Sequence, residues 1–224
     1  MLIPIAIPIK PQIASEGIRL TQKVAEHGGD FCELWCDQLK LEDAITIAKA
    51  SDVPLIINLK DETEQGTFKG SISEKLNYLA RLSELPQVSY VDIRFDLLDD
   101  AFLSAIKKPI IASYHDFERT KPLPELLDIV DKMALTKPAI IKLSTTIQYE
   151  IDLINLFQLQ LRTANWRKRR IVIGMGDKGV ATRVMSPLFE HALTFASLDS
   201  TTTTAPGQLT VSELRREWET LRFG

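Results

Sequence analysis

The chain has 224 residues, of which 45% are hydrophobic and 25% are charged, and its formal net charge is −3. Because 30 acidic residues outnumber 27 basic ones, the composition disfavours nucleic acid or an anionic membrane as the main partner. No apolar segment approaches the ~20 residues that a membrane span needs, and the N-terminal stretch MLIPIAIPIK is too short and too rich in proline for a signal peptide. We therefore expect a soluble, cytoplasmic protein.

Eight short apolar runs recur along the chain, and each is typical of a buried strand. In chain order they are LIPIAI (2–7), DFCELW (30–35), PLIINL (54–59), YVDIRF (90–95), PIIASY (109–114), AIIKLS (139–144), IVIGMG (171–176) and ALTFAS (192–197). Segments with helical spacing lie between the runs, for example residues 15–29, 71–85, 122–136 and 148–166. Alternating strands and helices predict a parallel sheet covered by helices. Eight such units favour an α/β fold, a single-domain (β/α)8 TIM barrel over residues 1–224.

Side chains along a strand alternate between two faces, and five consecutive strands sort into an apolar face and a polar face. The apolar face suits contact with helices, and its members are Leu34, Cys36, Ile57, Leu59, Val91, Ile93, Phe95, Ala112, Tyr114, Ile141 and Leu143. The polar face would fill the barrel interior, and its members are Glu33, Trp35, Asn58, Lys60, Asp92, Arg94, Ser113, His115, Lys142 and Ser144. These polar residues fall late in each strand, where barrel enzymes place their catalytic groups. Burying them without partners costs several kcal/mol, which favours a site over pure scaffolding.

Lys142 and His115 are the two members of the polar face with the clearest chemistry. Taken alone, Lys142 is explained by a side chain that reaches solvent at a strand end, and His115 by a hydrogen-bonded core histidine. Their occurrence on adjacent strands with the same parity, beside Glu33 and Arg94, favours a functional site. Desolvation and nearby positive charge lower the pKa of a lysine, and a partly neutral amine is a carbonyl nucleophile.

Two further clusters carry little functional signal. Cys32 and Cys36 have no second pair and no clustered histidines, so we expect apolar packing and no metal site. The one dense basic cluster is RKRR at residues 167–170, which we expect to be a solvated helix end.

Two glycine-containing loops follow the last two predicted strands. GMGDKG (174–179) matches a dinucleotide-binding pattern, but it follows the seventh strand, so a loop-shaping role beside Arg183 is favoured. The planar fork of Arg183 suits a substrate carboxylate, with a surface salt bridge as the alternative. TAPGQ (204–208) places Thr204 and Gln208 where barrels often hold the anionic group of a ligand. A simple proline–glycine turn is the alternative there.

Several segments resemble the type I 3-dehydroquinate dehydratases of the shikimate pathway, and the resemblance covers nearly the whole chain. The segments are SYHDFERTKP (113–122), the lysine of AIIKLS 27 residues after His115, RVMSPLFEHALTF (183–195) and the closing TAPGQ. The fold that this resemblance implies is the barrel already expected from the strand pattern.

The resemblance also implies roles for individual residues. Lys142 would form a Schiff base with the substrate ketone, His115 would move protons as general acid and base, and Glu64 would orient His115. The implied substrate-binding residues are Glu33, Trp35, Lys60, Arg183, Thr204 and Gln208. Trp35 and Lys60 stand where the family usually has arginines, Thr204 replaces a serine, and the stretch KDETEQG around Glu64 lacks the usual run of two glycines.

Such a dehydration yields 3-dehydroshikimate and needs no metal, nucleotide or other cofactor. The resemblance further implies a homodimer, and some relatives are fused to shikimate dehydrogenase. Residues 61–70 and the segment around Thr201 are the candidates for a closing loop. Two alternatives remain at this point: a Schiff-base aldolase on the same barrel, and a non-catalytic barrel that binds a shikimate-type ligand.

Overall fold

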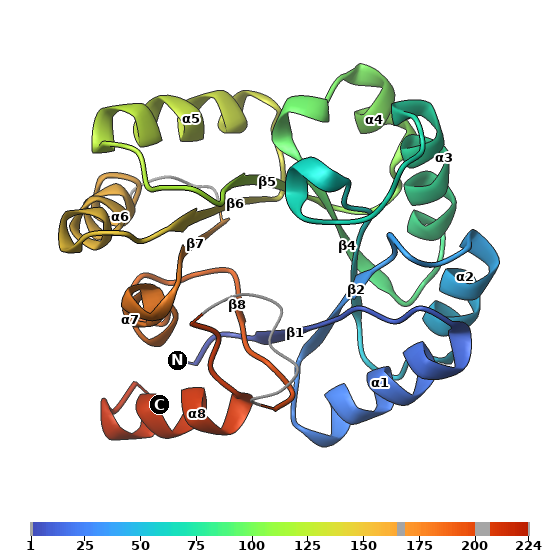
Figure 1. Ribbon diagram of the computed structural model, residues 1–224, viewed down its shortest axis with the longest axis horizontal. Helices are drawn as coiled ribbons and strands as arrows, with labels where there is room; N and C mark the ends of the chain where they lie inside the picture. Colours follow the sequence, from blue (N-terminus) through green and yellow to red (C-terminus); the bar gives the residue numbers. More distant parts are fainter. Residues whose placement is uncertain (1, 165–168, 200–206, 224) are drawn as a thin grey trace. The chain divides into compact units, whose positions relative to one another are not determined.

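The computed structural model describes residues 2–164, 169–199 and 207–223 (Figure 1). It divides into two compact units, one of residues 6–111 and one of residues 1–5 with 112–224. Each of the eight predicted apolar runs contains or overlaps an observed strand. One domain over residues 1–224 stays a prediction.

The unit of residues 6–111 is built from four strands and their following helices. Its elements are β1 (Ile5–Ile9), α1 (Ala14–Glu26), β2 (Phe31–Trp35), α2 (Leu41–Ala50), β3 (Leu55–Asn58), α3 (Ile72–Ser83), β4 (Val88–Arg94) and α4 (Asp100–Ala105), with short 3-10 turns at Glu62–Glu64 and Phe95–Leu97. β1 pairs with β2, β2 with β3 and β3 with β4, all in parallel. The register sets Trp35 opposite Asn58 at the carboxyl ends of β2 and β3.

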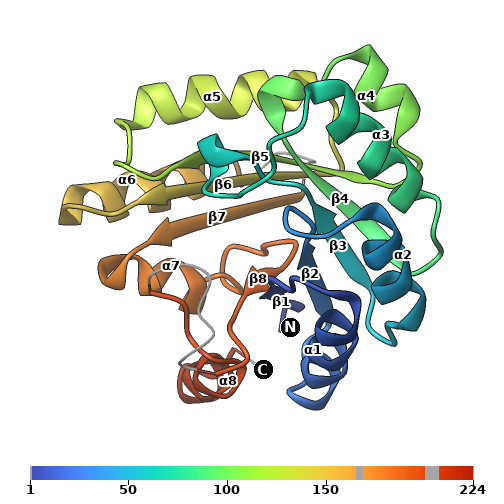
Figure 2. The same ribbon diagram turned by 45° about the vertical axis from the view of Figure 1, so that its right-hand side comes forward.

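Local sequence explains how the helices of this unit begin and pack. Ser71 caps α3, and the Glu74 side chain accepts a hydrogen bond from the Ser71 backbone N–H in return. Gly17 lets α1 approach α2 closely, since a Cβ at that position would lie 2.3 Å from Cδ1 of Ile47. Figure 2 shows α2 and α3 along one side of β3 and β4. Cys36 lies against Tyr78 of α3, so its parity faces the helices, as predicted.

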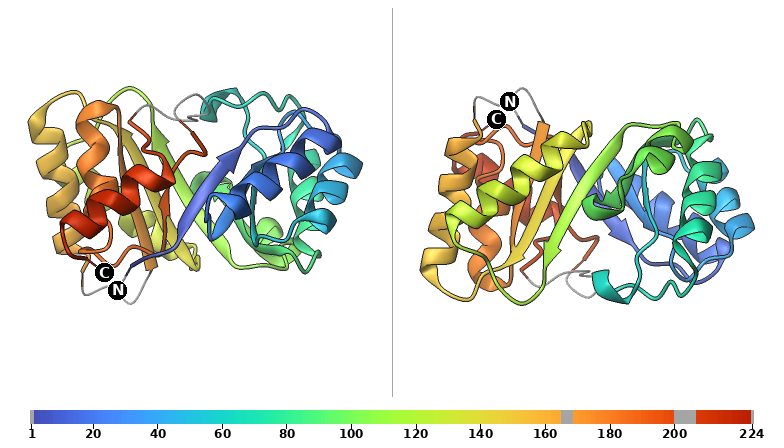
Figure 3. Two further views of the ribbon diagram at one scale, coloured as in Figure 1. Left: turned by 90° about the horizontal axis from the view of Figure 1, so that it is seen from below. Right: turned by 90° about the horizontal axis from the view of Figure 1, so that it is seen from above.

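The unit of residues 112–224 continues the alternation. Its elements are β5 (Ile110–Asp116), α5 (Leu123–Leu135), β6 (Ile140–Thr146), α6 (Glu150–Arg162), β7 (Arg169–Met175), α7 (Val180–Val184), β8 (Thr194–Phe195) and α8 (Val211–Thr220), with a 3-10 turn at Asp177–Gly179. β6 and β7 pair in parallel over seven residues. Figure 3 shows α6 and α7, coloured yellow to orange, beside the strands β6 and β7.

The prediction that RKRR (167–170) is a solvated helix end is wrong for its second half. Arg169 and Arg170 begin β7, while Arg167 and Lys168 lie outside the described residues. The Arg170 guanidinium donates to the backbone oxygens of Thr163 and Phe189, at 3.3 and 3.1 Å. These charge-assisted hydrogen bonds explain how a basic residue fits into a strand: the guanidinium of Arg170 binds carbonyl groups at the ends of neighbouring segments.

The strands follow the order β7-β6-β5-β4-β3-β2-β1-β8 in one sheet. Strands that neighbour one another in chain order also neighbour one another in the sheet, with β8 next to β1, which is the order of a (β/α)8 barrel. The predicted α/β fold class is therefore confirmed.

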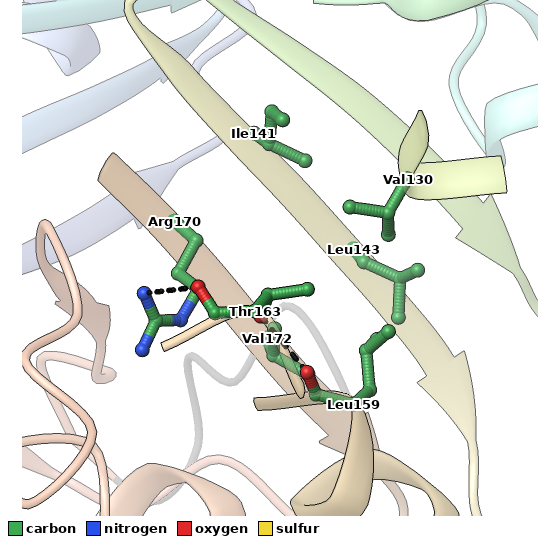
Figure 4. Close-up of a pocket in the computed structure, with 7 residues that line it drawn as sticks. All are labelled: Val130, Ile141, Leu143, Leu159, Thr163, Arg170 and Val172. Carbon is green, nitrogen blue, oxygen red and sulfur yellow. Dashed lines mark hydrogen bonds between the residues drawn. The ribbon is translucent and has the colours of Figure 1, made fainter. Parts of the chain in front are cut away.

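The helix-facing side of β6 is visible in a small cavity between that strand, β7 and the helices α5 and α6 (Figure 4). Its volume is about 10 Å³, and it is lined by Val130, Ile141, Leu143, Leu159, Thr163, Arg170 and Val172. Ile141 and Leu143 thus face helices, as the parity predicts. Because strand side chains alternate, Lys142 and Ser144 point to the opposite face of the sheet.

Both cysteines are buried and free, and burial raises the pKa of each thiol. Within residues 2–164, 169–199 and 207–223, the helices all fall short of the length and apolar character that crossing a bilayer would require.

Candidate active site

Trp35 is the centre of a polar cluster in the unit of residues 6–111. The ring is 8% exposed, and its Nε1–H donates to Oε2 of Glu33 at 2.9 Å. Two ammonium groups lie near the ring: Lys10 Nζ at 3.6 Å and Lys60 Nζ at 4.0 Å from its centroid. Such contacts attract a cation to the ring face by roughly 0.5–2 kcal/mol each. The structure therefore gathers the predicted residues Glu33, Trp35 and Lys60 in one place.

Lys10 belongs to this cluster, and the sequence analysis missed it. Burial is the main cause that lowers the pKa of Lys10, and the positive charge of Lys60 adds to it, while Asp37 and Glu33 act in the opposite direction. Lys10 directly follows β1. Extending the parity rule to the first strand, and one residue beyond its end, would have found it.

Asn58 lies beside Trp35 in the register and is 1% exposed. Within the described ranges, neither its Oδ1 nor its Nδ2 has a hydrogen-bond partner. Buried amides are nearly always hydrogen-bonded, so an unsatisfied one marks a group that a ligand or water can satisfy.

Glu64 lies in the 3-10 turn that follows β3 and is 4% exposed. Burial raises its pKa, and the negative charges of Asp92 and Asp61 act in the same direction, whereas Lys60 and Lys75 oppose the shift. Lys75 approaches it from α3, with Nζ 3.9 Å from Oε2 of Glu64. The predicted orienting carboxylate is thus a buried acid with cations nearby.

The loop after Glu64 has a backbone shape that explains its missing glycine. Gln65 adopts φ 59, a left-handed conformation that glycine takes with little strain. At Gly66 a Cβ would lie 2.2 Å from the backbone oxygen of Lys60. The loop therefore needs glycine at residue 66 for space, while residue 65 tolerates a side chain at some conformational cost.

Lys142 and Arg183 both contact Phe195 in the unit of residues 112–224. Lys142, on β6, is 4% exposed, and its Nζ lies 4.3 Å from the centroid of the Phe195 ring. Arg183, on α7, is 2% exposed, and its Nη1 donates to the backbone oxygen of Phe195 at 3.5 Å. Phe195, which forms half of β8, was not singled out from the sequence, and its apolar run gave no signal that would have done so.

The Arg183 guanidinium is buried, and among residues 2–164, 169–199 and 207–223 no carboxylate pairs with it. Its Nε has no hydrogen-bond partner within the described part of the chain. Burial lowers the pKa of Arg183 to about 10, so the group still carries a positive charge at neutral pH. A buried guanidinium with an unsatisfied N–H is suited to an anionic ligand, and its planar fork matches a carboxylate.

His115 lies on β5, the strand next to β6 in the sheet, and is half-buried. Its ring stacks on Phe117, with centroids 5.6 Å apart and an interplanar angle of 2°. On the same strand, Ser113 is fully buried and its hydroxyl has no hydrogen-bond partner within the described ranges. Ser113 and His115 share one parity on β5, so both side chains point to the same face of the strand, where an imidazole is suited to proton transfer to a bound molecule.

The glycines of GMGDKG shape two touching loops. Gly176 adopts φ 87, and a Cβ on Gly207 would lie 2.3 Å from the backbone oxygen of Gly176. Gly174 and Gly179 likewise approach each other closely. These contacts support the loop-shaping interpretation of the motif over a nucleotide site. Gln208 follows this contact and is half-buried, whereas Thr204 and Thr201 lie outside the described residues.

Comparison with known proteins gives one family. A model of the type I 3-dehydroquinase family matches residues 5–222. The chain is 31% identical over 220 residues to the 3-dehydroquinate dehydratase of Methanocaldococcus jannaschii, a match that covers 96% of this chain and 97% of that protein.

Two further matches concern a longer protein and a solved structure. The chain is 29% identical to the chloroplastic bifunctional 3-dehydroquinate dehydratase/shikimate dehydrogenase of Arabidopsis thaliana over 98% of its own length, but it spans only 37% of that enzyme. The crystal structure of 3-dehydroquinate dehydratase from Geobacillus kaustophilus superposes with a TM-score of 0.91 at 19% identity, over 99% of this chain and 92% of the other. This last likeness shows the shared fold.

Proposed function

Because the chain belongs to the type I 3-dehydroquinase family and is therefore a hydro-lyase, we propose that it converts 3-dehydroquinate to 3-dehydroshikimate through an imine on Lys142. The observation that supports the covalent step is the position of Lys142: the residue is 4% exposed, and its ammonium group lies against an aromatic ring. Withdrawal from water favours the neutral amine, which is the form that attacks a ketone.

The proposed dehydration has four steps: imine formation, proton removal, loss of the β-hydroxyl group and hydrolysis of the imine. The Lys142 amine adds to the substrate ketone, and loss of one water gives an iminium ion. His115 removes a proton from the adjacent carbon, and the electron pair moves into the enamine. The enamine expels the β-hydroxyl group, which takes the proton from His115 and leaves as a second water. Hydrolysis of the imine then consumes one water, releases 3-dehydroshikimate and restores Lys142.

Arg183 supplies the charge that this substrate needs. A keto acid carries a carboxylate, and the buried guanidinium with its unsatisfied Nε is matched to such a group. This feature favours the dehydratase over a sugar-phosphate aldolase, which needs a cradle for phosphate. We assign Thr204 and Gln208 to the same end of the substrate, on the resemblance alone.

The remaining assignments concern the unit of residues 6–111. We propose that Glu33, Trp35 and Lys60 contact the substrate hydroxyl groups, and that Glu64 orients His115. The buried amide of Asn58 supports a polar ligand beside Trp35, because its oxygen and nitrogen have no hydrogen-bond partner within the described ranges.

Turnover of 3-dehydroquinate by the purified chain tests this function. We expect the conjugated enone of the product to appear as an increase in ultraviolet absorbance, and the exposed-lysine variant Lys132→Met to match wild type. Binding of the substrate without absorbance change would favour the non-catalytic ligand-binding barrel. Cleavage of a sugar phosphate with no dehydration would favour the aldolase.

We further propose that the chain acts in the cytoplasm as a homodimer. Exposed apolar side chains on α6, Ile151, Ile154 and Leu161, offer surface for a second copy. Light scattering on the eluted protein should give a mass of about two chains, and Ile154→Lys should shift it toward one. A fused or associated shikimate dehydrogenase stays a prediction, and pull-down from the source cell would test it.

A further inference from the structure

Lys75 is a buried charge that the proposed reaction does not use. It lies on α3, and 4% of the residue is exposed. Lysine is rarely buried unless it is paired, so its partners indicate what it does. Its Nζ lies 2.7 Å from Oδ2 of Asp61, 3.9 Å from Oε2 of Glu64 and 6.0 Å from the centroid of the Phe68 ring. All three partners belong to the segment that carries Glu64.

Asp61 ties Lys75 to the backbone of this segment. Its carboxylate accepts a hydrogen bond from the backbone N–H of Thr63 at 3.1 Å, and its backbone oxygen accepts from the N–H groups of Glu64 and Gly66 at 3.0 and 2.8 Å. Burial would raise the pKa of Asp61, but the hydrogen bonds from Lys75 and Thr63 outweigh it and lower the pKa. Asp61 is therefore a charged anchor with two counter-ions: Lys75 at 2.7 Å from Oδ2, and Arg94, whose Nη1 lies 3.8 Å from Oδ1.

The segment closes on itself as well. The backbone N–H of Phe68 donates to the oxygen of Lys60 at 3.0 Å, and Asp61 and Phe68 form an isolated bridge. Both ends of residues 60–68 therefore meet, and two cations hold the segment that carries Glu64: Lys75 from α3 through Asp61, and Arg94 through Asp61 and Thr63.

Several charged groups surround the Glu64 carboxyl. Asp92 on β4 and Asp61 are like charges that disfavour its ionised form, and burial acts in the same direction. Lys60 and Lys75 favour the ionised form. At the end of β4, burial opposes the charge of Arg94, but Asp96 and, after it, Glu64 and Asp61 outweigh burial and raise the Arg94 pKa. Lys75 is the member of this set that reaches Glu64 from a helix, and it touches both the acid and the anchor of its loop.

We propose that Lys75 is a positioning residue for the dehydration: it fixes the loop that carries Glu64 and keeps the Glu64 carboxylate ionised at the working pH. The idea rests on the proposed function, in which Glu64 orients His115. A carboxylate that becomes protonated accepts a hydrogen bond from the imidazole less well, so the histidine loses its orientation.

The proposal predicts shifts of opposite sign for two variants of one ion pair. Lys75→Met removes a cation, so the pKa of Glu64 should rise, by about one unit for an opposite charge at this distance. Asp61→Asn removes a like charge and leaves Lys75 without its main carboxylate, so the pKa of Glu64 should fall. A merely structural ion pair would make both variants behave alike, because either change breaks the same contact.

The test measures the Glu64 carboxyl directly and the reaction separately. Carbon-13 NMR of labelled glutamate, with the Glu64 signal assigned from Glu64→Gln, gives the pKa in each variant. The pH profile of kcat/KM gives the acidic limb. We expect the acidic limb to move to higher pH in Lys75→Met and to lower pH in Asp61→Asn. In Lys75→Arg it should lie at the same pH as in wild type. Below the limb a one-unit shift lowers the rate of Lys75→Met about tenfold.

Lys132→Met is the matched control, since Lys132 forms an ion pair of the same 2.7 Å length with Asp128, but on the surface. It should leave the pH profile unchanged. Shifts of the same sign in Lys75→Met and Asp61→Asn, or an unshifted Glu64 signal in both, would overturn the proposal. If Lys75→Met does not fold, the sign of the shift in Asp61→Asn decides. Absence of dehydratase activity in wild type would defeat the proposed function, while the NMR shifts would still test the link between Lys75 and Glu64.

Discussion

Lys75 and Lys142 are equally buried, with 4% of each residue exposed, but their surroundings differ. Lys75 Nζ lies 2.7 Å from a carboxylate oxygen of Asp61, whereas Lys142 Nζ lies 4.3 Å from the centre of the Phe195 ring. A carboxylate balances an ammonium charge permanently, and a ring face attracts it only weakly. Burial alone therefore does not show which of the two lysines is a nucleophile; we propose that Lys142 is the nucleophile and that Lys75 positions the loop of Glu64.

The same contrast separates two arginines of residues 112–224. In both, the Nε has no hydrogen-bond partner within the described residues, but Arg170 donates to two backbone oxygens at 3.3 and 3.1 Å, whereas Arg183 is more deeply buried and donates to one at 3.5 Å. Removal of Lys75 or Arg170 should therefore cost stability. Removal of Lys142 or Arg183 should cost activity.

The largest expected effect belongs to Lys142→Met. It removes the covalent nucleophile, so kcat for dehydration should fall on the order of 10⁶-fold. The melting temperature should stay close to that of wild type, because methionine is of similar length and fills much of the same buried space. Steady-state kinetics and calorimetry measure the two quantities. Residual activity within a hundredfold of wild type would contradict the proposal that Lys142 is the covalent nucleophile.

Arg183→Met should lower kcat/KM by roughly 10²- to 10³-fold, as expected when a buried charged hydrogen-bonding partner of a carboxylate is lost. Its stability should hold, since the guanidinium has few bonds to lose. Arg170→Met is the matched control and should show the reverse: weaker folding with normal kcat/KM. If both variants lost stability alone, Arg183 would be a structural residue.

Lys75→Met should lower the free energy of unfolding by about 2 kcal/mol, a value reduced from that of a fully buried pair because the Asp61 side chain is 28% exposed. Lys132→Met, at an exposed pair of equal length, should cost less than about 0.5 kcal/mol. Urea titration measures both. Equal losses would mean that burial of the pair has no energetic consequence.

His191 shows a third way to bury a basic group, which is to keep it neutral. Burial, helped by the charge of Arg170, lowers its pKa from the ordinary 6.5 to about 3, and its Nε2 lies 2.6 Å from Oε1 of Gln160. A lowered folded-state pKa means that the unfolded chain binds the proton first, so stability is present above pH 6.5 and is lost as the pH falls toward 3.

Between pH 7 and pH 5 this residue should cost about 2 kcal/mol of stability. His191→Gln, which keeps a neutral polar side chain, should flatten the acid side of the profile by that amount. Unfolding free energies at a series of pH values measure it. An identical pH dependence in wild type and variant would show that His191 is not the titrating group.

The smallest effect concerns Trp35→Phe, which keeps a ring for Lys10 and Lys60 but removes the Nε1–H that donates to Glu33. Loss of one such bond is worth about 1 kcal/mol, so kcat/KM should fall about fivefold. Trp218→Phe on α8 loses the indole N–H bond of 2.8 Å to the backbone oxygen of Val184 on α7, and it should lower stability without changing kcat/KM. A normal kcat/KM in Trp35→Phe would remove the indole from substrate recognition.

The sequence predicted the strands well because buried parallel strands leave nearly continuous apolar runs, and the parity of β6 fixed which way Lys142 points. It predicted the extent of β8 poorly: the run 192–197 contains a strand of only two residues, Thr194–Phe195. Hydrophobicity records burial, but the backbone pairing that defines a strand depends on the neighbouring segment.

The residues that sequence reasoning missed are those whose role is set by distant partners. Lys75 lies in a helix, where polar residues are usual, and the carboxylate that pairs with it belongs to Asp61, fourteen residues earlier. Lys10 follows a strand by one residue, and only the nearby Trp35 ring marks it. Spacing along the chain cannot record either contact.

Borohydride reduction in the presence of 3-dehydroquinate, followed by peptide mass spectrometry, tests the central claim most directly. A covalent imine on Lys142 predicts that the peptide containing this residue gains the mass of the reduced substrate, and that Lys142→Met gains none. Turnover with no adduct, or an adduct on Lys10 or Lys60 in its place, would contradict the assignment of Lys142 as the nucleophile.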